Sequence, residues 1–245
     1  MATIPALHDR TALVTGASRG IGAAIATTLA QAGARVAVNY RARSDQADAV
    51  VAAIRAAGGQ AIAVAADVSQ GSAVADMVKR VEQALGPIDI LINNAGIAIT
   101  RNLDDLSETD FDRTILVNLK SAFLCTKAVV PAMQARKWGR IVNISSGAAR
   151  GAGAIGPHYN ASKAGMEGLT RGYAARLVKD GITVNAVAPS LIETDMMGGR
   201  TDLASRIPLG RMGQPTEVAQ AVLMVLGNDY MTGQTIVLNG GMSFI

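Results

Sequence analysis

The sequence predicts an α/β fold in which helices cover both faces of a doubly wound, mostly parallel sheet of about seven strands. Short apolar runs rich in strand-forming residues recur along the whole chain. Longer segments separate them, and their apolar residues stand three or four apart, which is typical of helices. Because a parallel neighbour needs a crossover connection, and because near-continuous apolar strands have both faces covered, this alternation favours a parallel sheet with helices on both faces.

The predicted strands are short, and the segments between them have helical spacing, as at Ile21, Ile25 and Leu29 after the first strand. One segment departs from this alternation. Residues 190–213 carry glycines and polar residues, and we expect a loop with a short helix there, after the carboxyl end of a strand. The predicted strands span residues 11–15, 35–40, 60–66, 88–93, 140–145, 182–188 and 234–239.

Length and composition predict one domain. With 245 residues and 49% hydrophobic content the chain can bury a large core, and we expect a single domain over residues 1–245 with a lid at about 190–213. No uninterrupted apolar run has membrane-spanning length, and the N-terminal stretch has no basic region followed by an apolar core. These features predict a cytoplasmic protein.

Charge and cysteine content exclude some classes of function. Against 19 Asp and Glu stand 23 Lys and Arg, but these are scattered, and aromatic residues make up only 3% of the chain. Such a composition argues against nucleic acid as a partner. The single cysteine, Cys125, cannot form an internal disulfide and has no metal-ligating residue nearby. We expect it in the core and predict no metal site.

Two glycine-rich stretches compete as a phosphate-binding turn. GAGAIG at 151–156 matches the pattern G-x-G-x-x-G, whereas TGASRGIG at 15–22 spaces its glycines differently. Dinucleotide pyrophosphate binds at the helix N-terminus directly after the first strand, where free N–H groups and the helix dipole favour anions. Only 15–22 follows a strand directly, and we expect Pro157 and His158 to separate the other stretch from its helix. We assign the phosphate to 15–22 and interpret 151–156 as a mobile loop.

Four motifs resemble those of the short-chain dehydrogenase/reductase family. They are TGASRGIG at 15–22, NNAG at 93–96, YNASK at 159–163 and NAVAP at 185–189, in the family's order and over nearly the whole chain. The stretches TGQTIVLNGGM and IETDM are most similar to bacterial 3-oxoacyl-acyl-carrier-protein reductases. The resemblance implies a Rossmann fold and an NAD(P)-dependent oxidoreductase that acts on a carbonyl or a secondary alcohol.

Charge near the second predicted strand favours NADPH over NADH. An NAD site usually has an acidic residue there for the ribose 2′-hydroxyl, whereas an NADP site has basic groups for the 2′-phosphate. This chain has no acid at that point but has Asn39 and Arg41, and the resemblance places Arg19 at the same phosphate. For both arginines the alternative is a solvated surface position.

The resemblance assigns further residues to the cofactor. It implies that Asp67 bonds the adenine amino group, with capping of a helix that begins near Ser69 as the alternative. It also implies that residues 94–96 line the adenosine and that Ile192 and Thr194 hold the nicotinamide carboxamide. The predicted cofactor-binding residues are Gly16, Ser18, Arg19, Gly20, Ile21, Gly22, Asn39, Arg41, Asp67, Val68, Asn94, Ala95, Gly96, Tyr159, Lys163, Pro189, Ile192 and Thr194.

A tyrosine and a lysine four residues apart are the candidates for proton transfer. If residues 158–177 are helical, Tyr159 and Lys163 share one face. A free tyrosine has a pKa of about 10, and a nearby ammonium lowers it, so we expect Lys163 to turn Tyr159 into an efficient acid. The alternative is a surface pair on an amphipathic helix.

Two more catalytic candidates come from the resemblance. Ser146 is implied to hydrogen-bond the substrate oxygen as charge develops, while its neighbour Ser145 bonds backbone. Asn118 is implied to hold a water that links the lysine to solvent, and the alternative is a structural asparagine with satisfied polar groups. For His158, contact with substrate and a structural place are equally open. The predicted catalytic set is Asn118, Ser146, Tyr159 and Lys163.

Two segments are expected to form the part of the site that contacts the substrate. The glycine-rich stretch 147–158 connects the catalytic strand to the catalytic helix, so we expect it to form one wall of the substrate pocket, and residues 190–206 to form a substrate lid. Close relatives have APG where this chain has APS. If that glycine has a positive φ, Ser190 costs stability or reshapes the lid.

The leading hypothesis is an NADPH-dependent 3-oxoacyl thioester reductase. Acyl carrier protein is acidic; Lys137 fits one of the basic positions expected near the pocket mouth, but Asp180 occupies the other. The alternatives are a general ketoreductase or secondary-alcohol dehydrogenase acting on another small substrate, and a non-catalytic nucleotide-binding regulator. The resemblance adds a homotetramer built on the helices around 107–135 and 158–179.

Overall fold

The computed structural model describes residues 7–195 and 201–244 of the chain. Its strands form one seven-stranded sheet in the order β3-β2-β1-β4-β5-β6-β7, and every neighbouring pair is parallel. The predicted doubly wound α/β fold is therefore confirmed. The strands are β1 (Thr11–Val14), β2 (Arg35–Tyr40), β3 (Gln60–Ala65), β4 (Ile88–Asn93), β5 (Gly139–Ile144), β6 (Ile182–Pro189) and β7 (Thr235–Leu238).

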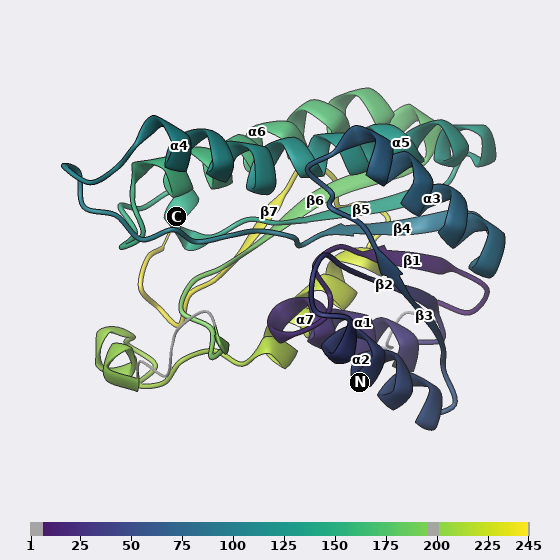
Figure 1. The fold of residues 1–245 in the computed structure, drawn as a ribbon, viewed down its shortest axis with the longest axis horizontal. Helices are drawn as coiled ribbons and strands as arrows, with labels where there is room; N and C mark the ends of the chain where they lie inside the picture. Colours follow the sequence, from purple (N-terminus) through teal and green to yellow (C-terminus); the bar gives the residue numbers. More distant parts are fainter. Residues whose placement is uncertain (1–6, 196–200, 245) are drawn as a thin grey trace.

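Helices cover both faces of this sheet. Figure 1 shows α3, α4, α5 and α6 on one face and α1, α2 and α7 on the other. A π-helical turn, η1 (Leu116–Lys120), joins α4 to α5, and 3-10 turns follow β5, α6 and β6: η2 (Gly147–Ala149), η3 (Val178–Asp180) and η5 (Thr201–Arg206). The α-helices are α1 (Gly20–Gln31), α2 (Ser44–Ala56), α3 (Gly71–Leu85), α4 (Glu108–Ile115), α5 (Ser121–Arg136), α6 (Pro157–Leu177) and α7 (Pro215–Leu226).

The core has one apolar layer on each face of the sheet. Ile25 of α1 packs in the layer that α7 shares, whereas Met77 of α3 and Met133 of α5 belong to the opposite layer. Cys125 lies in that second layer, fully buried, and burial raises the pKa of its thiol to about 12. The thiol stays protonated at physiological pH and packs as a core side chain, as its apolar sequence context predicts.

One helical stretch, Glu108–Arg136, is long and apolar enough to cross a membrane by length and composition. It consists of α4, η1 and α5, and its buried side chains, including Val129 and Met133, pack in the core beside α3 and the sheet. Its apolar character therefore serves a helix that covers the sheet.

Five of the predicted strands differ from the observed ones by one residue at one or both ends, and the starts of two helices also differ from the prediction. Pro157 and His158 do not precede the catalytic helix but form its first turn, because a proline at the first helical position gives up an N–H that would have no partner there. Helix α3 begins at Gly71 rather than near Ser69, since residues 67–70 form a turn in which the N–H of Gln70 bonds the Asp67 carbonyl.

Candidate active site

The glycine turn follows β1 directly, at the point where the strand order reverses between β2 and β4. Gly16 and Gly20 have φ angles of 62° and 55°. A Cβ on Gly22 would lie 2.5 Å from the Gly16 carbonyl oxygen, and a Cβ on Gly16 would lie 2.9 Å from the Ala95 Cα. Only glycine fits these positions. The Arg19 side chain does not cap α1, so N–H groups at this helix N-terminus are free for an anion, and the turn fits a dinucleotide pyrophosphate.

Two asparagines, Asn39 and Asn94, hold this turn in place through hydrogen bonds to its main chain. Asn39 is buried; its side-chain oxygen accepts from the Gly16 N–H at 3.1 Å, and its amide group donates to the carbonyls of residues 40, 64 and 66. Asn94 donates to the carbonyls of Thr15 and Gly16 at 2.9 and 3.0 Å. All polar atoms of the Asn39 side chain are thus engaged by the protein itself, and its predicted place at the cofactor stays a prediction.

The three charged candidates for cofactor binding, Arg19, Arg41 and Asp67, lie in two regions of the site. The Arg19 guanidinium forms an ion pair with Asp195 at 3.0 Å. Arg41 is exposed and lies close enough to Asp67 for its charge to act on that carboxylate. Burial acts to raise the pKa of Asp67, but hydrogen bonds from Ser69 and the charge of Arg41 outweigh it, so the pKa lies below its usual value. Asp67 thus stays ionised at neutral pH.

The Asp67 side chain does not cap α3. One of its oxygens accepts from the main-chain N–H and the hydroxyl of Ser69, at 3.0 and 2.7 Å, two residues before the helix begins. This Asx turn fixes the carboxylate at the carboxyl end of β3 and replaces the helix cap considered from the sequence.

The remaining predicted cofactor positions lie along the same edge of the sheet. Thr194 lies next to Gly20, since a Cβ on Gly20 would be 3.5 Å from the Thr194 methyl group. Ile192 is buried and forms a β-bridge with Gly213, so its side chain serves the core while its main chain lies beyond β6. Val68 is also a core side chain. Ser18 and Ile21 are half-buried in the turn and helix α1, and Pro189 ends β6.

The catalytic candidates gather where β5 meets α6. Tyr159, in the first turn of α6, is 9% exposed and lies close enough to Ser146, which follows β5, for the serine to act on its pKa. Lys163 lies one turn further along α6, buried, with its ammonium 5.8 Å from the centre of the Tyr159 ring. Its Nζ donates to the Ile144 carbonyl at 2.8 Å. These contacts exclude the surface-pair alternative for Tyr159 and Lys163.

The pKa values of this pair differ from the sequence expectation. Burial raises the pKa of Tyr159 above its usual value, and the hydrogen bond from Ser146 opposes this only in part. Burial lowers the pKa of Lys163 to about 8. Lys163 does not lower the pKa of Tyr159 in this arrangement, because its ammonium lies beside the ring and bonds the Ile144 carbonyl rather than the phenol oxygen.

Asn118 lies in the π-helical turn η1, buried beside the same site. Its side-chain oxygen accepts from the Ile97 N–H at 2.7 Å, and its amide group donates to the Ile97 carbonyl and the Ser162 hydroxyl. The side chain is thus fully satisfied, as in the structural alternative. A Cβ on Gly96 would lie 3.3 Å from the Asn118 oxygen and 3.6 Å from the Lys163 ammonium, so Gly96 belongs to the catalytic end of its segment.

His158 does not face a substrate. It is fully buried, and its Nε2 lies 2.9 Å from the Ile99 carbonyl oxygen. Because a carbonyl only accepts, this nitrogen carries the proton, and Nδ1 is left without a hydrogen-bond partner. His158 therefore ties the start of α6 to the segment that follows β4.

A half-buried ion pair next to the site was missed from the sequence. Glu167, one turn beyond Lys163 on α6, bonds Arg150 at 2.9 Å and lies 3.5 Å from the Ser145 hydroxyl, which also donates to the Lys163 carbonyl. The signal was present, because residues 159, 163 and 167 are spaced by four and so share one helix face. The pair fixes the 147–150 turn against α6.

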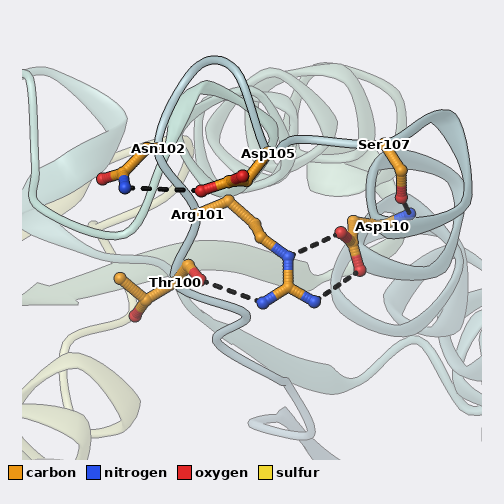
Figure 2. Close-up of a pocket in the computed structure, with 6 residues that line it drawn as sticks. All are labelled: Thr100, Arg101, Asn102, Asp105, Ser107 and Asp110. Atoms are coloured by element: carbon orange, nitrogen blue, oxygen red, sulfur yellow. Dashed lines mark hydrogen bonds and ion pairs between the residues drawn. The ribbon is translucent and has the colours of Figure 1, made fainter.

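The second glycine stretch forms the surface beside these residues. Residues 151–154 are exposed, and the Ile155 carbonyl accepts from the Arg101 N–H. Next to it lies an open cavity of about 590 Å³ between β4 and α4, in which Figure 2 shows the Arg101 guanidinium directed at the Asp110 carboxylate. Of the expected lid, residues 196–200 lie outside the described residues; residues 201–206 form the predicted short helix.

Comparisons with known proteins agree with this geometry. The sequence profile of the family described as short chain dehydrogenase matches residues 10–203. The chain is 43% identical over 243 residues to the 3-oxoacyl-acyl-carrier-protein reductase FabG of Staphylococcus epidermidis, covering 96% of this chain and 99% of that protein. It is 45% identical over 242 residues to the 3-oxoacyl-acyl-carrier-protein reductase of Synechocystis, covering 97% and 98% of the two chains.

Other relatives carry different substrate names. A hydroxy(phenyl)methylsuccinyl-CoA dehydrogenase subunit, BbsD, of Thauera aromatica is 41% identical over 244 residues, covering 97% of this chain and 98% of that protein. The crystal structure of a dehydrogenase/reductase from Sinorhizobium meliloti superimposes with a TM-score of 0.91 at 37% identity, covering 98% and 97% of the two chains. This chain belongs to the short-chain dehydrogenase family of oxidoreductases, which act on CH–OH and C=O groups with an NAD(P) cofactor.

Proposed function

We propose that this enzyme uses NADPH to reduce a carbonyl to a secondary alcohol, and that its substrate is a 3-oxoacyl thioester. The observation that carries the proposal is the place of the buried Tyr159 side chain beside Ser146, with Lys163 one helical turn behind. Binding of a nucleotide alone does not require such a set, which argues against the non-catalytic alternative.

Tyr159 is suited to donate a proton in the reductive direction. Its raised pKa keeps the phenol protonated at neutral pH, and the alkoxide that develops on the substrate is a much stronger base. When bound, the cofactor supplies the hydride. The Ser146 hydroxyl, beside the phenol, donates to the same substrate oxygen and stabilises its developing charge. Lys163, whose pKa of about 8 leaves it mostly protonated at neutral pH, is the nearby group that we propose returns a proton to the phenolate.

The preference for NADPH rests on Arg41. Its exposed guanidinium has no acidic neighbour at the end of β2, and Asp67, the nearby carboxylate, is already bonded by Ser69. A phosphate on the adenosine ribose would make charge-assisted hydrogen bonds with Arg41 that NADH cannot make. Arg19 contributes once it is released from Asp195.

The proposed 3-oxoacyl substrate is supported by the two 3-oxoacyl-acyl-carrier-protein reductases to which the chain is 43% and 45% identical. The surface weighs against strong recognition of an acidic carrier. Lys137, the basic candidate near the mouth, is paired at 2.5 Å with Asp180, which also accepts from Gln134. Arg101 is likewise paired with Asp110 in the neighbouring cavity. We therefore propose the thioester itself, and not the acidic carrier, as the recognised group.

The second candidate function is a general ketoreductase or secondary-alcohol dehydrogenase. The Lys137–Asp180 pair favours it, because this pair removes the free positive charge that an acidic carrier would bind. The relative from Thauera aromatica, named for a hydroxy(phenyl)methylsuccinyl-CoA substrate, is 41% identical, so identity at this level is compatible with a different substrate, although that one too is a thioester.

The assembly and location are further parts of the proposal. Phe111 of α4 and Phe123 of α5 are exposed, at 43% and 39%, on the helices that we expect to build a homotetramer. We place the enzyme in the cytoplasm, where NADPH is available as a reductant.

The test is the rate of NADPH consumption with an acetoacetyl thioester, an acetoacetate ester and a simple aryl ketone. Fast turnover of the thioester with slow turnover of the other two supports the 3-oxoacyl function. Faster turnover of the simple ketone would instead establish the general ketoreductase. The Tyr159→Phe variant, assayed in parallel, measures the background that does not depend on the proposed acid.

A further inference from the structure

The segment that follows β6 crosses to the phosphate-binding turn. The Ser190 N–H bonds the Leu238 carbonyl, and Ile192 pairs with Gly213, so the start of the segment is anchored to β7 and to the chain before α7. Its end lies over the glycine turn, where Thr194 approaches Gly20. Residues 190–195 thus hold their last side chain, that of Asp195, at the N-terminus of α1.

The Asp195 carboxylate lies where an anion can bind the Arg19 guanidinium. It lies 3.0 Å from the guanidinium of Arg19, the residue immediately before α1. A carboxylate on this guanidinium takes a place that a nucleotide phosphate can also take. Both side chains are partly exposed, Arg19 at 41% and Asp195 at 68%, so the pair can exchange partners without breaking a packed contact.

We propose that Asp195 competes with the 2′-phosphate of the cofactor for Arg19 and so weakens the selectivity of the enzyme for NADP(H) over NAD(H). The inference rests on the proposed use of NADPH. When the phosphate binds Arg19, the carboxylate loses its partner and stands near a second negative group. NAD(H), which has no 2′-phosphate, leaves the ion pair intact and does not meet this cost.

Direct binding tests the competition without turnover. Calorimetry with NADP⁺, NAD⁺ and adenosine 2′,5′-bisphosphate compares the wild type with Asp195→Asn. Because exposed ion pairs are weak, we expect Asp195→Asn to tighten NADP⁺ and the bisphosphate by about two- to fivefold and to leave NAD⁺ unchanged. In an Arg19→Ala background the same substitution should change nothing, since the shared partner is gone.

Glu193→Gln is the matched control. It removes the same charge from the same segment, but Glu193 bonds Gln214 at 2.7 Å rather than Arg19, so all three affinities should stay as in the wild type. Equal tightening of NAD⁺ and NADP⁺ by Asp195→Asn, or no change in either, would overturn the inference. Wild-type protein that binds the bisphosphate no better than 5′-AMP would overturn the NADPH proposal itself, which is a separate failure.

Discussion

The ammonium of Lys163 lies 5.8 Å from the centre of the Tyr159 ring, yet its hydrogen bond goes to the main-chain oxygen of Ile144, at 2.8 Å. Both side chains are buried, so each is pushed toward its neutral form: the pKa of the lysine falls to about 8 and that of the tyrosine rises. The protein alone therefore holds a neutral phenol ready to donate its proton, while the pKa of the lysine lies close to physiological pH.

The lowered pKa of Lys163 predicts a pH-dependent contribution to stability. Between about pH 8 and 10.5 the unfolded chain keeps a proton that the folded chain has lost, so the unfolding free energy rises with pH in this window. The stability of the wild type relative to Lys163→Met should increase by about 2–3 kcal/mol from pH 7 to pH 10. Urea unfolding at the two pH values measures the difference, and an equal difference at both would contradict the lowered pKa.

Tyr159→Phe should remove the proton donor while keeping the ring. We expect kcat for ketone reduction to fall by about 10²–10⁴-fold, with the Kd for NADPH changed less than about threefold. Tyr173→Phe is the matched control, because Tyr173 lies nearer the C-terminal end of the same helix and packs against the core. Its kcat should equal that of the wild type. A Tyr159→Phe enzyme that keeps most of its turnover would exclude Tyr159 as the acid.

Arg41→Ala should reduce the preference of the enzyme for NADPH over NADH. Loss of one charge-assisted hydrogen bond at an exposed site predicts a decrease of about tenfold in the ratio of kcat/KM for NADPH to that for NADH. Arg43→Ala, two residues further along the exposed start of α2, removes the same charge and should leave the ratio unchanged. If the two variants behave alike, the 2′-phosphate is held by general charge and not by Arg41.

Asp180→Arg should create a better surface for an acidic carrier. The substitution releases Lys137 from its ion pair and adds a second positive charge beside it. We expect KM for acetoacetyl-acyl-carrier-protein to fall several-fold, whereas KM for the neutral acetoacetyl-N-acetylcysteamine should stay constant. An unchanged KM for the carrier substrate would show that the carrier, if it binds, docks on another face.

The fold could be predicted from the sequence because each strand is a short apolar run and helices such as α1 and α3 carry an apolar stripe. Ile25 and Leu29 of α1, and Met77 and Val81 of α3, are buried as that spacing requires. The least accurate predictions concern side chains whose partners are main-chain groups. Asn39 was assigned to the cofactor from its place at the end of the second strand, but its polar atoms bond four main-chain groups contributed by three different segments.

Contacts between residues far apart in the sequence could not be predicted either. The partners Arg19 and Asp195 are 176 residues apart, and Lys137 and Asp180 are 43 apart, so no local pattern brings them together. The buried place of His158 also depends on a distant group, the Ile99 carbonyl. Spacing on one helix could have revealed Glu167 beside Lys163, whereas its ion pair with Arg150 required the path of the chain after β5.

Ser190 and Gly147 form a complementary pair next to Ser146, the serine that we propose to be catalytic. Among the described non-glycine residues only Asp9 and Lys137 have a positive φ, so Ser190 does not carry the backbone strain considered from the sequence. Its hydroxyl instead fills the space where a Cβ on Gly147 would lie. Gly147→Ala should therefore displace Ser190 or the neighbouring Ser146, at a cost of about 1–3 kcal/mol in stability and a several-fold loss of kcat.

The double variant separates packing from any other role of the glycine. Ser190→Gly alone should cost about 0.5–1 kcal/mol through the added freedom of the unfolded chain. In that background Gly147→Ala should be nearly neutral, because the space that Ser190 filled is open, and kcat should return to the value of Ser190→Gly. Urea unfolding and ketone turnover of all four proteins give the coupling. If Gly147→Ala is equally damaging with and without Ser190, the two residues do not share this space, and the pocket wall is set by the backbone of Gly147 alone.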